Sequence, residues 1–142
     1  MADVDRDVLI VEDDPSVAQA IADGVRLAGY TVCAICATGA EAIDWMRRRR
    51  PPLAIIDVEL DDALSGVEAA REMQRIGPIG ILFVTGFPET VRAADVGHAW
   101  MPKPYRVLDL INGLEVVRAI STGGPLGAPL PAALRLISER RR

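Results

Sequence analysis

The sequence predicts an α/β protein with a parallel five-stranded sheet and helices on both faces. Two observations carry this prediction. Apolar, β-branched runs alternate with helical patterns along the chain, and these runs are nearly continuous rather than alternating in polarity. Strands covered on both faces have this composition, whereas half-exposed strands alternate. Repeated β-α units joined by right-handed crossovers give a doubly wound sandwich, for which we expect the strand order 2-1-3-4-5.

Five apolar segments have the length and composition of strands: 7–11, 30–36, 53–57, 79–85 and 98–102. The last contains Pro102, which cannot donate a hydrogen bond to a neighbouring strand, so we expect this strand at an edge of the sheet. Cys33 and Cys36 have the CxxC spacing of redox and metal sites. They lie within a predicted strand, where residues three apart point to opposite faces, which favours ordinary core cysteines.

Helix start signals follow the first three strands. An Asp-Pro pair at 14–15 offers an N-cap and a proline at the first helical position, and 38–41 and 65–68 fit the capping box. A longer helix is expected from about 106 to 120. The segment 86–97 is short and holds two glycines and a proline, which predicts at most one or two helical turns.

Composition predicts one globular domain, residues 1–120, with no output domain after it. The 142 residues are 50% apolar and 25% charged, with a net charge of −4 that gives no general nucleic-acid footprint. No apolar run reaches a membrane span and the N-terminus is unlike a signal peptide, so we expect a cytoplasmic protein without membrane contact. Residues 121–142 are interpreted as a Gly/Pro-rich linker and a short C-terminal helix, whose apolar stripe is Leu130, Leu134 and Ile137.

Acidic residues stand at the ends of two strands that we expect to be neighbours. Glu12, Asp13 and Asp14 follow the first strand, and Asp57 closes the third. Ligands bind at the carboxyl ends of parallel strands, so these acids should meet in one cleft. Two carboxylates about 4 Å apart repel by roughly 4 kcal/mol at an effective dielectric of 20, and a hard divalent cation relieves that repulsion. The cluster therefore predicts a Mg²⁺ site with phosphate chemistry.

Two further strand ends supply a hydroxyl and an ammonium group. The fourth strand ends at Thr85, and the fifth is followed at once by Lys103. Lys103 is the only lysine among the 16 basic residues, the rest being arginine. A compact ammonium differs chemically from a planar guanidinium, which supports a specific role for this side chain.

The motifs "LIVEDDP", "LAIIDVEL", "FVTG" and "PKPY" occur in order, each at a strand end. Together they resemble the receiver domain of two-component response regulators, a flavodoxin-like fold, over roughly residues 6 to 120. The resemblance implies that Asp57 is a phosphoacceptor, modified by a histidine kinase or a histidine phosphotransfer protein. It implies a Mg²⁺ (or Mn²⁺) ion ligated by Asp13, Asp57 and the backbone carbonyl of Glu59, with Glu12 acting through water.

The same resemblance assigns the phosphoryl-binding and switch positions. Lys103 would neutralise charge on the transferring oxygens, and Thr85 with Gly86 would bind the phosphoryl group. The Lys103–Pro104 bond is expected to be cis. Trp100 stands where receivers carry a switch aromatic, and it fits a core tryptophan equally well. The sequence departs from the usual receiver pattern at Asp61, in a longer loop after Asp57, and in a shortened segment between Thr85 and Lys103.

Several functions remain open at this point. The first is a stand-alone, non-enzymatic regulator that signals through an unknown downstream protein, with a phosphoryl shuttle or sink as its alternative. An aspartyl-phosphate hydrolase and a phosphate-independent scaffold are less favoured. Nucleic-acid binding through the C-terminal arginines is disfavoured on an acidic chain, and dimerisation is not decided.

Overall fold

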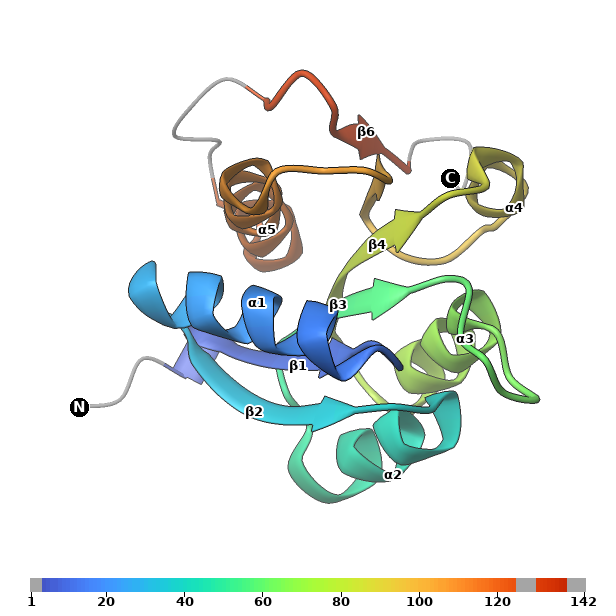
Figure 1. Ribbon diagram of the computed structural model, residues 1–142. Helices are drawn as coiled ribbons and strands as arrows, with labels where there is room; N and C mark the ends of the chain where they lie inside the picture. Colours follow the sequence, from blue (N-terminus) through green and yellow to red (C-terminus); the bar gives the residue numbers. More distant parts are fainter. Residues whose placement is uncertain (1–3, 125–129, 138–142) are drawn as a thin grey trace.

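The computed structural model describes residues 4–124 and 130–137 (Figure 1). Within these ranges the chain forms one sheet with the order β2-β1-β3-β4-β5-β6. The first five strands are parallel, which confirms the predicted order, whereas β6 runs antiparallel to β5 and was not predicted. The strands are β1 (Asp7–Val11), β2 (Thr31–Cys36), β3 (Leu53–Asp57), β4 (Gly80–Thr85), β5 (Ala99–Pro102) and β6 (Arg135–Leu136).

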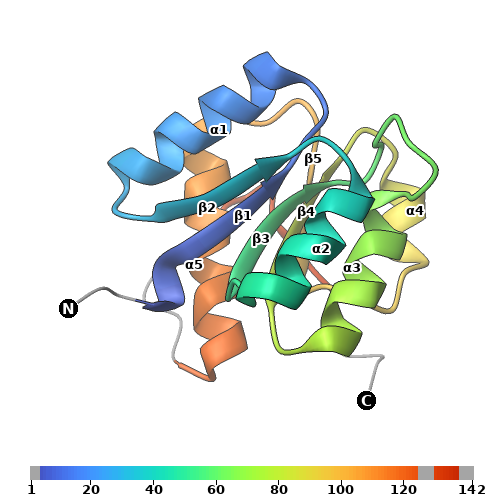
Figure 2. The same cartoon turned by 90° about the horizontal axis from the view of Figure 1, so that it is seen from below.

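Helices cover both faces of the sheet, with α1 and α5 on one face and α2 and α3 on the other (Figures 1 and 2). The Asp14 carboxylate caps α1 by accepting the Ser16 N–H at 2.9 Å, and the capping box of Ser65 and Glu68 is complete. The helices are η1 (Val4–Arg6), α1 (Pro15–Leu27), α2 (Gly39–Arg49), α3 (Gly66–Ile76), α4 (Pro88–Arg92) and α5 (Val107–Thr122). The α4 helix is as short as predicted.

The buried side chains form two clusters, one on each face of the sheet. Every residue of β3 and β4 is buried, as expected for central strands covered on both faces. Ile55 belongs to the cluster under α1 and α5, and the next residue, Ile56, belongs to the cluster under α2 and α3. Alternation along the strands therefore distributes the continuous apolar runs between two cores.

The position of β5 corrects one prediction. It is not an edge strand, because β6 pairs with it through Ala99 and Trp100. Pro102 is still tolerated. The next residue, Lys103, donates its N–H to the Thr85 carbonyl of β4 at 2.8 Å, so the nitrogen of Pro102 faces the opposite side. The pairing with β6 does not extend to Pro102, and no ladder hydrogen bond is lost there.

The C-terminal segment corrects a second prediction. Residues 130–137 form a turn and the strand β6 rather than the predicted helix. Leu134 and Ile137 are only 4% and 7% exposed, and each joins a different core cluster. The α5 helix ends at Thr122, two residues beyond the predicted boundary, with Gly123 in the left-handed conformation at its C-cap. The rest of the predicted tail, 125–129 and 138–142, lies outside the described residues.

Candidate functional site

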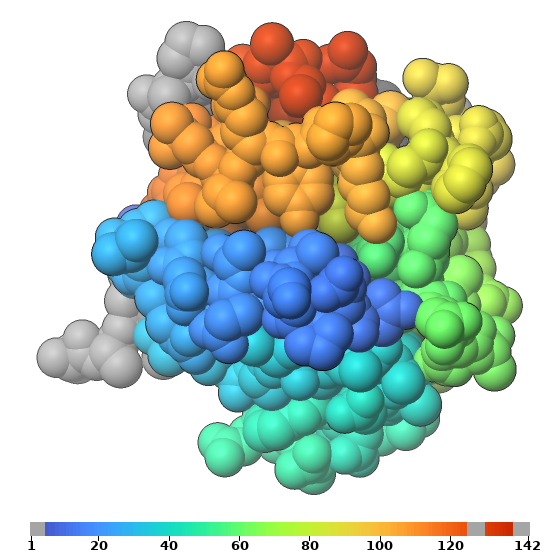
Figure 3. All heavy atoms as spheres, viewed as in Figure 1, coloured from blue at the N-terminus to red at the C-terminus, as the bar shows by residue number. Residues whose placement is uncertain are grey.

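The carboxyl ends of β1, β3, β4 and β5 meet at one edge of the sheet, as the strand order requires. A cavity of about 710 Å³ lies at this edge, between α1 and the segment that joins β5 to α5. Figure 3 shows these two segments against each other, in blue and orange, with the green loop after β3 beside them. The charged residues that line the cavity are Glu12, Asp13, Asp14, Asp57, Glu59 and Lys103.

Asp57 and Lys103 form an ion pair at the bottom of this site. The Lys103 Nζ lies 2.9 Å from Asp57 Oδ1, which also accepts the Glu59 N–H at 3.0 Å. Asp57 is only 2% exposed. Burial raises the pKa of Asp57, although the hydrogen bond from Lys103 opposes that rise. Burial also disfavours the Lys103 ammonium, but its bond to Asp57 and the surrounding carboxylates outweigh this and raise the pKa of Lys103.

Glu12, Asp13 and Asp57 form the predicted acidic cluster, with one oxygen of each within 4.8 Å of the others. Burial, reinforced by the Asp57 charge, raises the pKa of Glu12 to about 7, although the Asp14 N–H and Lys103 oppose it. Glu12 Oε1 is buried without a hydrogen-bond partner. An unpaired buried oxygen among convergent carboxylates fits a hard divalent cation, which binds oxygen ligands and offsets their repulsion.

Thr85 and the loop after it are held by Glu59. The Thr85 hydroxyl, which is completely buried, donates to Glu59 Oε2. The Gly86 N–H donates to Glu59 Oε1 at 2.8 Å, and the Lys103 Nζ lies 3.8 Å from the same oxygen. The Phe87 N–H in turn donates to the Thr85 hydroxyl oxygen at 2.9 Å. Sequence reasoning assigned only the backbone of Glu59 to the site and missed its side chain.

The sequence between residues 8 and 115 matches the response regulator receiver domain family. The chain belongs to that family. The receiver domain is 34% identical to the transcriptional regulatory protein PdtaR of Mycobacterium tuberculosis, over 98% of this chain and 68% of PdtaR. It is 30% identical to the phyllosphere-induced regulator PhyR of Methylorubrum extorquens, over 62% of this chain and 33% of that protein.

Solved structures agree with this assignment. The N-terminal domain of a response regulator/sensory box/GGDEF protein from Carboxydothermus hydrogenoformans superposes with a TM-score of 0.74. It is 28% identical, with 82% of this chain and 97% of that one covered. A mutant form of PhyR from Bartonella quintana gives a TM-score of 0.64 at 28% identity, over 81% of this chain and 46% of that one. The comparisons therefore support the flavodoxin-like receiver fold and a place in two-component signalling.

The loop after Asp57 explains one departure from the usual receiver pattern. The Asp61 N–H donates to Asp13 Oδ2 at 2.7 Å, a bond that proline at this position could not make. The loop ends at Gly66, where an added Cβ would lie 2.2 Å from the Asp57 carbonyl oxygen. Asp61 therefore orients Asp13, and Gly66 allows α3 to start directly against the end of β3. Neither contact was predicted.

Trp100 is placed as a core residue. Its side chain is buried, with 6% exposure, and Trp100 on β5 is the register partner of Phe83 on the neighbouring strand β4. The Arg92 guanidinium of α4 lies 5.5 Å from the centre of its ring, within range of a cation–π contact. Its predicted switch role stays a prediction. The Lys103–Pro104 peptide bond is cis, as predicted.

The two cysteines do not form a disulfide. Both are free, with Cys36 buried and Cys33 half-buried at a register shift between β1 and β2. Burial raises the pKa of Cys36 to about 12, and burial together with Asp7 raises that of Cys33. Neither thiol is activated as a nucleophile. The core interpretation is therefore confirmed for Cys36.

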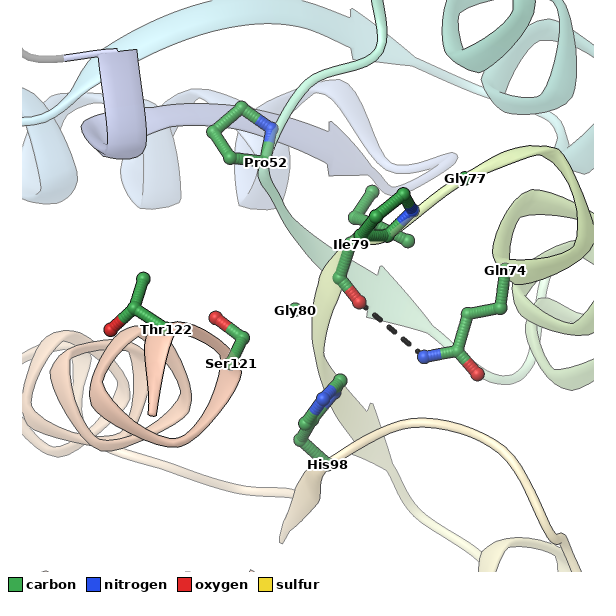
Figure 4. A pocket seen from close by; sticks show the side chains of 9 residues that line it. Pro52, Gln74, Gly77, Ile79, Gly80, His98, Ser121 and Thr122 are labelled. Atoms are coloured by element: carbon green, nitrogen blue, oxygen red, sulfur yellow. Dashed lines mark hydrogen bonds between the residues drawn. The ribbon is translucent and has the colours of Figure 1, made fainter. Parts of the chain in front are cut away.

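A second cavity, of about 340 Å³, lies at the opposite edge of the sheet (Figure 4). Its polar groups are used within the fold. The Gln74 amide donates to the Ile79 carbonyl at 3.4 Å, and His98 Nδ1 accepts the Ile81 N–H at 3.2 Å. Its lining residues include no carboxylate and no lysine, so it offers none of the chemistry of the first site. In the described part of the chain, no helix is both long and apolar enough to cross a membrane.

Proposed function

We propose that this receiver domain, together with the 130–137 segment that packs against it, is a response regulator that accepts a phosphoryl group on Asp57. The donor would be a histidine kinase or a histidine phosphotransfer protein in the cytoplasm, and the signal would leave through protein contacts. One observation carries the proposal: a nearly inaccessible carboxylate lies 2.9 Å from the only lysine and within 4.8 Å of two other acids. An aspartate with a purely structural role would be stabilised by the lysine alone, and the two neighbouring carboxylates would only repel it.

The chemistry required of Asp57 is nucleophilic. One of its carboxylate oxygens would form a bond to phosphorus, while the bond from phosphorus to the donor nitrogen breaks and that nitrogen keeps the electron pair. The Lys103 ammonium, 2.9 Å from Asp57 Oδ1, would offset the negative charge that gathers on the transferring oxygens. The Thr85 hydroxyl and Gly86 N–H, at the end of the neighbouring strand, would donate to the phosphoryl oxygens of the product.

Glu12, Asp13 and Asp57 are the residues that would hold a divalent cation in this site. When bound there, Mg²⁺ would offset the charge of these acids and of the phosphoryl oxygens. The unpaired Glu12 Oε1 is the feature of this chain that supports the assignment. The expected backbone ligand, the Glu59 carbonyl, stays a prediction.

The signal would leave through the loop that follows Thr85. The Phe87 N–H is bound to the Thr85 hydroxyl oxygen, and the Phe87 side chain is 60% exposed. A shift of Thr85 toward a phosphoryl group would therefore move an exposed aromatic residue at the start of α4. PdtaR is named a transcriptional regulator, which makes a link to transcription a reasonable place to look for the downstream partner.

Incubation with acetyl phosphate and Mg²⁺, followed by intact mass measurement, tests the proposal. We expect one phosphate adduct on the wild type, none on Asp57→Asn, and none when EDTA is present. An adduct that persists in Asp57→Asn would place the acceptor elsewhere. A folded wild type that binds Mg²⁺ but gains no phosphate from acetyl phosphate or from a phosphorylated phosphotransfer protein would refute it.

A further inference from the structure

In the unphosphorylated protein, the side chain of Glu59 contacts the groups that the proposed function assigns to phosphoryl binding. Its two oxygens accept the Thr85 hydroxyl and the Gly86 N–H, and Oε1 lies 3.8 Å from the Lys103 ammonium. These three donors are the ones that the proposed function assigns to a phosphoryl group on Asp57. Glu59 follows Asp57 by two residues, so both carboxylates come from the end of β3 and share one lysine.

The two acceptors cannot use these donors at the same time. The Gly86 N–H and the Thr85 hydroxyl each carry a single proton. A phosphoryl oxygen that accepts either of them must displace the Glu59 oxygen that accepts it now. The two anions would also face each other across Lys103, and like charges that share a site repel.

The surroundings of Glu59 leave it room to move. Its side chain is 29% exposed, and it lines the open cavity rather than the core. A Cβ added at Gly86 would lie 3.8 Å from Glu59 Oε1 and, its chain neighbours aside, would meet no other described atom within 4 Å. Within residues 4–124 and 130–137, the Glu59 side-chain oxygens accept hydrogen bonds only from Thr85 and Gly86.

We propose that the Glu59 carboxylate takes the place of the phosphoryl group in the unphosphorylated protein. The carboxylate binds Thr85, Gly86 and Lys103 until phosphorylation of Asp57 displaces it. The inference rests on the proposed function and adds that Glu59 competes with the phosphoryl group for the same hydrogen-bond donors. Glu59 is a positioning residue that opposes phosphorylation, since its departure must accompany the transfer. It also keeps the loop after β4 ordered before any signal arrives.

Removing the carboxylate should therefore speed phosphorylation. At saturating Mg²⁺, we expect Glu59→Ala to react with acetyl phosphate at least about tenfold faster than the wild type, equivalent to about 1.4 kcal/mol in the barrier. Glu59→Gln keeps an acceptor but not the charge, so its rate should fall between the two. Both variants keep the backbone carbonyl of residue 59. Glu89→Gln, which removes one exposed carboxylate from α4, serves as the matched control and should react as the wild type does.

A readout independent of phosphorylation is the exchange of the Gly86 amide hydrogen with solvent. Without donor, Glu59→Ala should exchange this hydrogen at least about tenfold faster than the wild type, while Glu89→Gln should not. Phosphorylation of the wild type should shift the Gly86 amide resonance. Equal reaction rates for the wild type and Glu59→Ala, or an unchanged Gly86 exchange rate, would overturn the inference and leave the proposed function standing. If no variant gains phosphate, the proposed function fails and the inference falls with it.

Discussion

Replacing Asp13 by asparagine should make the Mg²⁺-free protein more stable and remove most of the stabilisation that Mg²⁺ provides. Asp13 stands in the cluster with Glu12 and Asp57, where one oxygen of each lies within 4.8 Å of the others. Without a cation these charges repel. Asparagine has the same size, and its carbonyl oxygen can still accept the Asp61 N–H that Asp13 Oδ2 now accepts at 2.7 Å. The substitution therefore removes charge and leaves the loop contact in place.

The magnitude follows from the spacing. Two unit charges 4.8 Å apart repel by about 3.5 kcal/mol at an effective dielectric of 20. Asp13 is half-exposed, so solvent screens this repulsion, and we expect a gain of about 1–2 kcal/mol. An unfolding entropy of about 2.1 cal/mol/K per residue over 142 residues converts this into an increase in Tm of about 3–7 °C in EDTA. In the wild type, Mg²⁺ at 100 times its Kd should add about 2.7 kcal/mol.

Thermal unfolding of both proteins in EDTA and in saturating MgCl₂, at pH 8, measures both effects. Asp23→Asn is the control, because that carboxylate lies on α1 with 63% of its side chain exposed and away from the cluster. Its Tm in EDTA should stay within about 2 °C of the wild type, and its response to Mg²⁺ should be unchanged. The reasoning is refuted if Asp13→Asn is less stable than the wild type in EDTA, or if Mg²⁺ raises both Tm values equally.

Three further substitutions test other parts of the structure. Folded Glu12 holds its proton up to about pH 7, whereas unfolded glutamate releases it near 4.3, so the folded state binds more protons between these values. Stability in EDTA should therefore fall as the pH rises through this window, and Glu12→Gln should flatten that slope in Tm. Leu134→Ala should cost about 2–4 kcal/mol in urea unfolding, because the side chain is 4% exposed in the core; a loss below about 1 kcal/mol would show that β6 is not part of the fold. Gly66→Ala should cost more than about 2 kcal/mol, because its Cβ would lie 2.2 Å from a backbone oxygen. Its control, Gly123→Ala, meets no atom within 4 Å but has a φ of 75°, so it should cost only about 1 kcal/mol.

The parallel sheet could be predicted because each strand carries its own signal. Runs such as 53–57 are apolar at nearly every position, which only a central strand covered on both faces requires. The N-cap residues Asp14, Thr38 and Ser65 fixed the helix starts within a residue, although only Ser65 forms the reciprocal capping box, with Glu68. The acid cluster followed from the strand order, since β1 and β3 are neighbours and their carboxyl ends must converge. Local chemistry and topology were sufficient for these features.

The partners of individual side chains could not be predicted in the same way. Glu59 and Asp57 are two residues apart and thus directed to the same side of the chain, a signal that could have placed the Glu59 carboxylate in the cleft. Its hydrogen bonds to Thr85 and Gly86 depend on where the next strand ends, which the spacing of the acids does not reveal. The bond from Asp61 to Asp13 likewise joins two loops whose path is set by packing.

The C-terminal segment shows why one spacing can have two structural meanings. Leu130, Leu134 and Ile137 are spaced like one face of a helix, and on that basis a helix was predicted. In the extended chain around β6, Leu134 and Ile137 are three residues apart and point to opposite faces of the sheet, so each enters a different core. The same rule had been used to separate Cys33 from Cys36. A segment this short does not repeat its pattern often enough to distinguish the helical period from the strand period. Here the segment is extended because the free edge of β5 offers backbone groups with which β6 pairs.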